Sequence, residues 1–417
     1  MPRLLLLLPT LTYRTEAFLE AASRLAVEIT VGCNQTQALA PMQPSHNVTL
    51  DFLHPEEAAR IAGLFARRYP IDAVVGVDDD TAVAAAAISE ALRLPHNSVE
   101  STLAAKNKHL MREILSRHGV PVPHFILFSR QDDPALLADR VSYPCVLKPL
   151  ILAASRGVIR ADNSGEFVSA FRRIETILRQ PEVAARDEPA RRILVEDFIP
   201  GQEVALEGML TKGNLQVLAL FDKPDPLDGP FFEETIYVTP SRHPAAVQDE
   251  IVSCAARTAT ALGLREGPVH AELRFNSQGV WMIEMAARSI GGLCSRILRF
   301  GAGRSLEDLI LRHALGMEIE SMERERQPAG VMMLPIPQAG ILRQVHGKEE
   351  AESVPGIVEV AITAHLGQEL VPLPEGARYL GFIFARAESP DRVEASLREA
   401  QRRLQFTIEP LPVEARA

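Results

Sequence analysis

"PVHAELRFNSQGVWMIEMAARSIGG", residues 268–292, is the stretch that decides the fold. It predicts two apolar β-strands joined by a turn at "NSQG", and each strand carries one glutamate, Glu272 or Glu284. A glycine at the last turn position favours a three-residue loop, which pairs Asn276 with Val280. Counting outward from that pair places Glu272 directly opposite Glu284. A two-residue loop would put the two glutamates on opposite faces.

Two carboxylates that face each other favour a bound cation. Opposed side chains lie about 5 Å apart at Cβ, and their charges repel unless a cation lies between them or one carboxyl is protonated. Mg²⁺ suits such a pair, with water or phosphate oxygens as its other ligands. The alternative is that both glutamates face solvent. His270 and Arg274 alternate with Glu272 along one polar face, whereas the other face of this strand is apolar.

The residues after the second strand also suggest a site. Arg288 follows Glu284 by four residues and could neutralise charge on a transferring phosphoryl group. Its alternative role is a surface salt bridge, which contributes little to stability. Gly291 and Gly292 would let a ligand approach the backbone closely, although a plain turn would use them too.

Two lysines elsewhere lie where phosphates could be held. Lys108 lies on a helix that Ser101 would cap and that ends near residue 118. Lys148 ends the strand "YPCVLK" and precedes the loop "PLILAASRGVIRA". A lysine at a strand end, beside a loop of small residues, can hold α- or β-phosphates as a point charge. Each lysine could instead be a solvated surface residue.

The stretch "LVEDFIPGQEV", residues 194–204, suggests a slot for a nucleoside. Glu196 and Glu203 flank the apolar pair Phe198 and Ile199. An apolar slot with an acceptor at each end suits adenine and ribose, because the acceptors can bind the exocyclic amine and the hydroxyls.

The first hundred residues predict a parallel α/β domain, because strands alternate with helices. The expected strands are 3–8, 27–33 and 72–77, and the expected helices are 15–26, 55–69 and 80–92. Asp78, Asp79 and Asp80 follow a strand at its carboxyl edge, where ligands of α/β proteins tend to bind. The alternative is a cluster that caps the next helix.

Composition favours a cytoplasmic protein that does not act on nucleic acid. The chain has 417 residues and a formal net charge of −10, which argues against nucleic acid as the main partner. Its four cysteines are widely spaced, as is typical of a reducing cytoplasm. The run "RLLLLLP" imitates a signal peptide, but it lacks a clear cleavage site and a buried strand explains it better. No apolar run is long enough to predict a membrane span.

Five motifs, in this order, resemble the ATP-grasp superfamily: "NKHLMREILSRHGVPVP", "YPCVLKP", "ILVEDFIPGQEV", "VHAELRF" and "WMIEMAARSIGG". The resemblance implies an α/β (α+β) protein with an ATP-grasp fold and possible pairing as a homodimer. The implied domains are a Rossmann-like parallel-sheet domain at 1–100, an ATP-grasp domain at 101–320 with a lid subdomain at about 115–195, and a β-rich α+β domain at 321–417.

The same resemblance implies roles for single residues. ATP would be bound by Lys108, Lys148, Ser155, Gly157, Glu196, Phe198, Ile199 and Glu203, and Mg²⁺ by Glu272 and Glu284. Arg288 would stabilise an acyl phosphate. Gly291 would lie against substrate, and Glu234 would bind the amino group of the first amino acid.

Two departures from the superfamily pattern are informative. Ala286 stands where most members carry asparagine, and this departure is shared by the L-amino-acid ligase branch, whose members form dipeptides. The phosphate loop at 150–157 has a single glycine, Gly157, where the family usually has several. Ser155 and Arg156 could supply side-chain donors in their place. The lid would then be stiffer, or the loop would have lost its closing role.

These observations predict an ATP-dependent carboxylate–amine ligase that uses ATP, Mg²⁺ and amino-acid substrates. A carboxylate would attack the γ-phosphate to give an acyl phosphate and ADP, and an amine would then displace phosphate. One alternative is a carboxylase or purine-pathway ligase of the same superfamily. The absence of an "MKM" sequence disfavours only a self-contained biotin enzyme. The other alternative is a catalytically weak ATP-binding protein.

Overall fold

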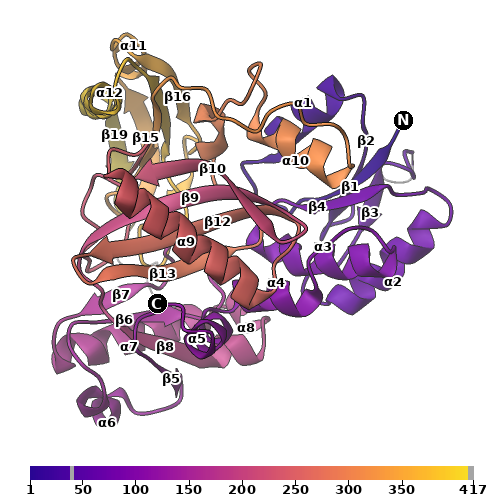
Figure 1. Cartoon of the computed structure of the whole chain (residues 1–417). Helices are drawn as coiled ribbons and strands as arrows, with labels where there is room; N and C mark the ends of the chain where they lie inside the picture. The colour runs from indigo at the N-terminus through magenta and orange to yellow at the C-terminus, as the bar shows by residue number, and fades with distance from the viewer. Residues whose placement is uncertain (38–41, 412–417) are drawn as a thin grey trace.

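The N-terminal segment forms a parallel sheet in the order β3-β2-β1-β4, drawn in indigo and purple in Figure 1. The computed structural model describes residues 1–37 and 42–411. The elements of this layer are β1 (Arg3–Leu7), α1 (Thr15–Arg24), β2 (Glu28–Cys33), β3 (Asn47–Thr49), α2 (Pro55–Ala66), β4 (Ala73–Gly76) and α3 (Asp79–Ala91). Leu4 to Leu7 are fully buried in β1, so the prediction of a buried first strand is confirmed.

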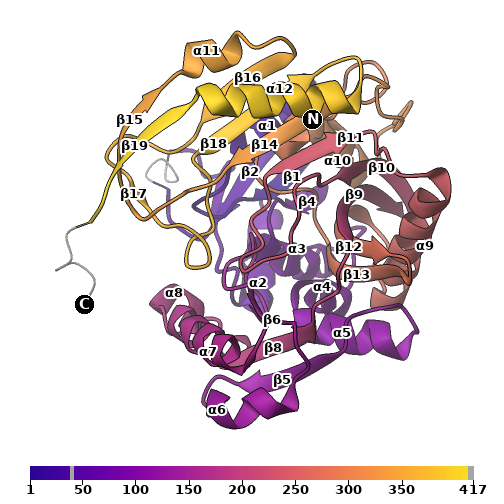
Figure 2. The ribbon, with the colours of Figure 1, turned by 90° about the vertical axis from the view of Figure 1, so that its left-hand side faces the viewer.

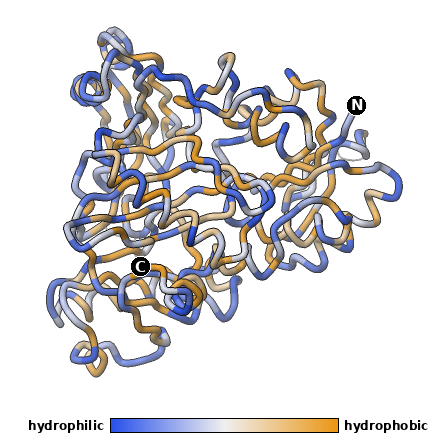
Figure 3. Tube along the Cα trace, in the orientation of Figure 1, coloured by the Kyte–Doolittle hydropathy of each residue, from blue (hydrophilic) through white to orange (hydrophobic). Residues whose placement is uncertain are grey.

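A central antiparallel sheet of eight strands organises the rest of the chain, in the order β13-β12-β9-β10-β11-β14-β18-β16. Its strands are β9 (Gln202–Thr211), β10 (Asn214–Asp222), β11 (Ile236–Thr239), β12 (Gly267–Asn276), β13 (Gly279–Ala286), β14 (Ala329–Leu334), β16 (Ile357–Ile362) and β18 (Gly381–Arg386). The strands on both sides of residue 320 therefore share one sheet. In Figure 3 its inner strands are largely orange, that is apolar, whereas outer turns are blue.

Two helices cover parts of this sheet. The buried residues of α9 (Ala245–Leu262), such as Ile251 and Ala255, pack against β9 and β12. The buried residues of α12 (Pro390–Arg403), Val393 and Leu397 among them, pack against β14 and β18. Figure 1 shows α9 lying across β9, β12 and β13.

A smaller antiparallel sheet, here called the lid sheet, has the strand order β5-β8-β6-β7. It and its helices comprise β5 (Phe125–Ser129), α6 (Pro134–Leu137), β6 (Cys145–Pro149), β7 (Ile159–Ala161), α7 (Ser164–Leu178), α8 (Pro181–Ala184) and β8 (Arg192–Asp197), with 3₁₀ turns at Ala138–Arg140 and Glu188–Arg191. Figures 1 and 2 place it at the opposite end of the molecule from α12.

The remaining elements complete the C-terminal segment and link it to the central sheet. They are a 3₁₀ turn at Cys294–Ile297, α10 (Leu306–Ala314), β15 (Gly340–His346), α11 (Lys348–Glu352), β17 (Glu369–Leu370) and β19 (Gln405–Glu409). Strands β15, β17 and β19 form a separate small sheet, in the order β17-β15-β19. Within the described residues, no helix has both the length and the apolar character needed to cross a membrane.

The helix predicted to begin at Ser101 is divided in two. Ser98, not Ser101, caps α4 (Val99–Lys106), and α5 (Lys108–Arg117) begins after Asn107. The Asn107 side chain accepts hydrogen bonds from the next free backbone N–H groups and so starts the second helix. This break places Lys108 in a first helical turn, where its N–H donates to the carbonyl of Leu150 at 3.0 Å.

Candidate functional site

The β12–β13 hairpin places Glu272 opposite Glu284, as predicted, but by a different route. Asn276 pairs with Gly279 instead of Val280, so the loop contains two residues and the prediction of a three-residue loop is wrong. With that loop alone, the two glutamates would have faced away from each other.

A β-bulge restores the register. The pairing shifts by one residue between Met282 and Glu284, which leaves Ile283 as the extra residue of β13. Arg112, on α5, donates from Nη2 to the carbonyl oxygen of Ile283 at 2.5 Å. The bulge is therefore held by a side chain 171 residues away in the sequence, which local sequence patterns cannot reveal.

One cavity of about 450 Å³ lies between the central sheet, the lid sheet and the loops that follow β1 and β4. The predicted site residues that line it are Lys108, Lys148, Ser155, Glu196, Phe198, Ile199, Glu203, Glu234, Glu272, Glu284, Arg288 and Gly291. Gly157 does not line it. A Cβ at Gly291 would meet no atom within 4 Å, so this backbone faces open space. The individual roles remain predictions.

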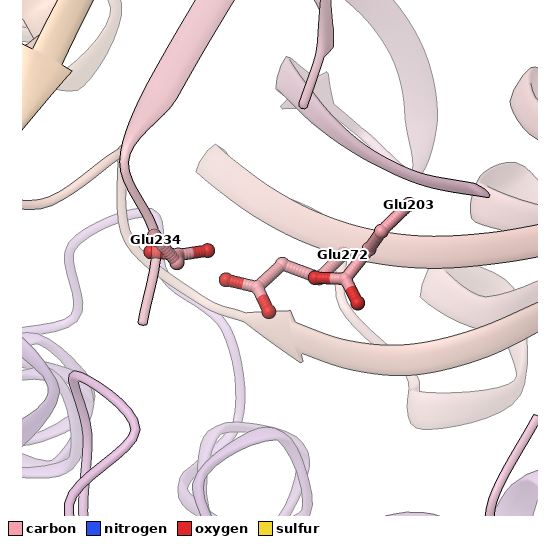
Figure 4. Close-up of side chains that lie close together, drawn as sticks. All are labelled: Glu203, Glu234 and Glu272. Carbon is pink, nitrogen blue, oxygen red and sulfur yellow. The ribbon is translucent and has the colours of Figure 1, made fainter. Parts of the chain in front are cut away.

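Three glutamates converge on a lysine that the sequence analysis missed. The ammonium of Lys223, just after β10, lies 2.8 Å from Glu203 Oε1 and 3.7 Å from Glu272 Oε2, and it also donates to Glu234 Oε1. Carboxylate oxygens of the three glutamates lie within 4.8 Å of one another. Figure 4 shows their side chains converging from separate strands and a loop. The sequence signal was only a lysine at a strand end, like Lys148.

Lys223 remains charged within this cluster. Its side chain is 3% exposed, and burial lowers its pKa, but Glu203, Glu234 and Glu272 outweigh burial and raise that pKa above its usual value. A metal ion among these three carboxylates would have to compete with the ammonium that already neutralises them. The Glu203–Glu234–Glu272 cluster therefore fits a metal ion poorly.

Glu272 and Glu284 together fit a divalent cation better. Their side chains are 24% and 27% exposed, toward the cavity. Burial alone would raise the pKa of Glu272, but Lys223 and His270 hold it below its usual range, so this carboxylate is ionised. Glu284 Oε1 accepts from Lys108 Nζ at 3.0 Å. Facing carboxylates that remain accessible supply the oxygen ligands that Mg²⁺ prefers.

Glu196 lies at the centre of a buried ion cluster. Its Oε1 accepts from Arg112 Nε at 2.6 Å, and its Oε2 lies 2.6 Å from Lys148 Nζ. The Glu196 side chain is 2% exposed and that of Arg112 is fully buried. Both carboxylate oxygens are thus engaged by cations. To accept a hydrogen bond from adenine as predicted, Glu196 would have to bond adenine and these two cations at the same time.

The predicted adenine slot is polar on one side. Two guanidinium groups lie over the Phe198 ring, that of Arg160 at 4.3 Å and that of Arg274 at 4.8 Å from its centroid. Arg274 also approaches Glu203, whose Oε2 is 3.8 Å from Arg274 Nε. A planar ring stacked on Phe198 would therefore have to share the aromatic ring with these two cations.

Arg288 meets the aspartates of the N-terminal sheet. Its Nη2 donates to Asp79 Oδ2 at 2.8 Å and its Nη1 to the carbonyl of Ser289 at 3.0 Å. Burial lowers the pKa of Arg288, but Asp79 and Glu284 outweigh this and raise it, so the guanidinium is charged. Asp78 caps α3 through a capping box, which confirms the capping alternative for this one residue.

Asp80, in the first turn of α3, pairs with a residue that follows α8. Both its oxygens accept from Arg186, at 2.5 and 2.7 Å, and Oδ1 also accepts from Lys106. Burial opposes ionisation, but Arg186 and Lys106 lower the pKa of Asp80 to about 2. We call residues 125–197, which form the lid sheet and its helices, the lid segment. Because Arg186 belongs to this segment, its bidentate pair with Asp80 holds the lid segment over one side of the cavity.

The glycine-poor phosphate loop is held by the C-terminal segment. Gly157 donates its N–H to the carbonyl of Pro374 at 2.8 Å, and Arg156 Nε donates to the carbonyl of Glu375 at 2.9 Å. Arg173, on α7, pairs with the Glu375 carboxylate at 2.5 and 2.9 Å. Ser155 takes a positive φ of 55° and lines the cavity. Arg156 also lines the cavity while it bonds to the C-terminal segment, and its donation to a phosphate stays a prediction.

A second buried arginine positions the loop that follows β13. Arg14, 1% exposed, donates to Glu307 and Ser289 at 3.0 Å each and also to the carbonyl of Ile290. Glu307 further accepts from Ser295 at 2.6 Å. No local sequence pattern around Arg14 indicates these bonds. Its partners lie more than 270 residues away.

Family models match three parts of the chain: an ATP-grasp N-terminal domain at residues 19–96, an ATP-grasp domain at 141–297 and an L-amino acid ligase C-terminal domain 2 at 332–409. The crystal structure of an L-amino acid ligase from Bacillus licheniformis is similar, with a TM-score of 0.83, 27% identity, and coverage of 98% of this chain and 99% of that one.

Two curated relatives match a smaller share of this chain. Dapdiamide A synthase from Enterobacter agglomerans is 28% identical over 57% of this chain and 55% of its own length. Alanine–anticapsin ligase from Bacillus subtilis is 25% identical over 57% of this chain and 51% of its own length. The chain thus spans about half the length of these two relatives.

Proposed function

Because the chain belongs to the ATP-grasp superfamily and carries a C-terminal domain of L-amino acid ligases, we propose that it joins two amino acids at the expense of ATP. In this reaction, the carboxylate of the first amino acid attacks the γ-phosphorus of ATP and releases ADP. The amine of the second amino acid then attacks the acyl phosphate and releases phosphate, which leaves an amide bond.

The observation that carries this proposal is the shared cavity. Lys108, Lys148 and Arg288 bring positive charge to it, and Glu272 and Glu284 bring two facing carboxylates. Phosphoryl transfer requires mainly that charges be positioned and neutralised, because its transition state is largely dissociative. A cavity that only stored a nucleotide would need no open space beside Arg288 and Gly291.

Each of these residues has a defined part in the proposed reaction. Lys108 and Lys148 hold ATP phosphates, and Arg288 neutralises charge on the transferred group and on the acyl phosphate. Glu272 and Glu284 would hold Mg²⁺, whose positive charge screens the ATP phosphates when it is bound. Glu234 holds the ammonium of the first amino acid, and the lid segment excludes water from the acyl phosphate.

A screen of amino-acid pairs tests the proposal. Purified protein with Mg-ATP is expected to release equal amounts of ADP and phosphate only when an acceptable pair is present, with one dipeptide formed per ADP. A Glu284→Ala variant serves as the inactive control. Release of AMP and pyrophosphate would contradict the acyl-phosphate route, and dependence on bicarbonate would favour a carboxylase.

The Mg²⁺ assignment predicts a specific defect. Glu272→Gln keeps the size of the side chain but removes one charged ligand, so the Mg²⁺ concentration for half-maximal ADP release is expected to rise about 10-fold or more. Titration of MgCl₂ at fixed ATP measures this value. Glu250→Gln, an exposed position on α9, is the matched control. Equal Mg²⁺ requirements in the two variants would remove Glu272 from the metal site.

The Asp80–Arg186 pair predicts an effect on nucleotide binding. Arg186→Gln should weaken lid closure, so the KM for ATP is expected to rise about threefold to fivefold, as follows from an ion pair that contributes up to about 1 kcal/mol. Arg179→Gln removes a different lid arginine, which pairs with Glu175 on the exposed side of α7, and should leave this KM unchanged. The same KM in both variants would show that closure does not depend on Asp80.

A further inference from the structure

The end of the cavity away from the lid sheet has an apolar wall. We define this apolar wall as five residues that line the cavity: Tyr13 from the loop after β1, Cys294, Met333 of β14, Tyr379 from the loop before β18, and Phe382 of β18. Ring centroids of Tyr13 and Tyr379 lie 5.4 and 5.9 Å from that of Phe382, both in edge-on contact. The sulfur atoms of Cys294 and Met333 are 3.5 Å apart.

The apolar wall adjoins the predicted amino-group site. Tyr237, which donates to Glu234 at 2.6 Å, lines the same cavity and belongs to the same hydrophobic core as Cys294 and Met333. Burial raises the pKa of Tyr379, and the nearby charge of Glu234 raises it further. An amino acid whose ammonium bonds to Glu234 would thus have the apolar wall within reach of its side chain.

The loop after β13 leaves space between this wall and Arg288. The Gly291 backbone faces open space, whereas a Cβ at Gly292 would lie 3.0 Å from Phe382 Cε1. Gly292 also has a φ of 59°, a conformation that favours glycine. The backbone therefore reaches the wall without a side chain that would fill the space.

We infer that the apolar wall binds the side chain of the first amino acid and selects a neutral, apolar one of medium to large size. This inference rests on the proposed ligase function. None of the five wall residues carries a charge at neutral pH, so a carboxylate or ammonium placed against them would lose its hydration without a partner. Aromatic edges and the two sulfur atoms instead adapt to leucine, methionine or phenylalanine side chains.

The test identifies the N-terminal residue of each dipeptide. Mass-spectrometric fragmentation assigns that residue, and ADP release gives kcat/KM for each first amino acid. Leucine, methionine and phenylalanine are expected to exceed aspartate, glutamate and lysine by at least about 100-fold. Equal or better use of charged first amino acids would overturn the inference while leaving the ligase function in place. So would an apolar preference confined to the C-terminal residue. Absence of ADP release with every pair would instead reject the ligase function.

A variant of the wall gives an independent measurement. Tyr13 is only partly buried and lies on a loop, so Tyr13→Lys is compatible with folding. It is expected to lower kcat/KM for apolar first amino acids about 10-fold or more, with the KM for ATP within about twofold of the wild type. Leu64→Lys, at a 51%-exposed position on α2, is the control and should change neither value. If the two variants behave alike toward apolar amino acids, Tyr13 does not contact the substrate and the inference fails.

Discussion

Replacing Arg288 with glutamine is expected to reduce kcat for ADP release by about 10²–10³-fold, because the variant loses a preorganised cation where charge develops in the transition state. The guanidinium is 13% exposed and bonded to Asp79, so little of its charge is screened by water. The hydrogen bond from Arg288 Nη1 to the carbonyl oxygen of Ser289 also keeps the guanidinium in place before substrate arrives. Single-turnover measurements with the best amino-acid pair would separate this loss from weaker binding.

A matched variant separates the charge of Arg288 from its ion pair. Asp79→Asn removes the partner of Arg288 but keeps the guanidinium, so its kcat should fall much less than that of Arg288→Gln. Arg288→Lys keeps a charge without the planar fork and should lie between the two. If Arg288→Gln retained kcat within about threefold of the wild type, Arg288 would have no part in the chemical step.

Replacing Arg14 with methionine is expected to lower the free energy of unfolding by about 3–5 kcal/mol, because Glu307 would be left buried without its cation. The Arg14 and Glu307 side chains are 1% and 3% exposed, so water cannot take over this interaction. Urea titration followed by circular dichroism measures the loss, provided that the unfolding transition is two-state.

The double variant Arg14→Met, Glu307→Leu provides the control for this prediction. It removes both buried charges, and it should recover much of the lost stability, since apolar replacement of a whole buried pair is often neutral. A loss below about 1 kcal/mol in the single variant would mean that Glu307 does not depend on the Arg14 cation, and that the existing hydrogen bond from Ser295 is enough for this carboxylate.

Local patterns were enough to predict most secondary structure of the described residues. The leucine run gave a buried strand, and the alternation of apolar and polar residues gave the hairpin that carries Glu272 and Glu284. These predictions succeed because strand and helix periods are encoded within a few residues. The hairpin register was right only because two errors cancelled: a shorter loop and a bulge at Ile283 that the prediction lacked.

The contacts that position the site could not be predicted in the same way. Arg112 with Glu196, Arg14 with Glu307 and Asp80 with Arg186 pair residues that are 84, 293 and 106 positions apart. No local spacing links such partners, because tertiary packing brings them together. For the same reason, the sequence presented Glu196 as a free acceptor, whereas its two oxygens are bonded to buried cations.

The continuity of the central sheet also affects how the protein is made. The parallel sheet needs only residues up to Gly76, but β11 has no neighbour on one side until β14 has been synthesised, and β14 in turn pairs with β18. While the residues between β11 and β14 are being synthesised, the nascent chain therefore exposes an open edge of the central sheet at β11. The apolar wall, which includes Met333 and Phe382, is the last part of the cavity lining to be completed. Ribosomal synthesis must pass residue 386 before any molecule can bind its substrates fully.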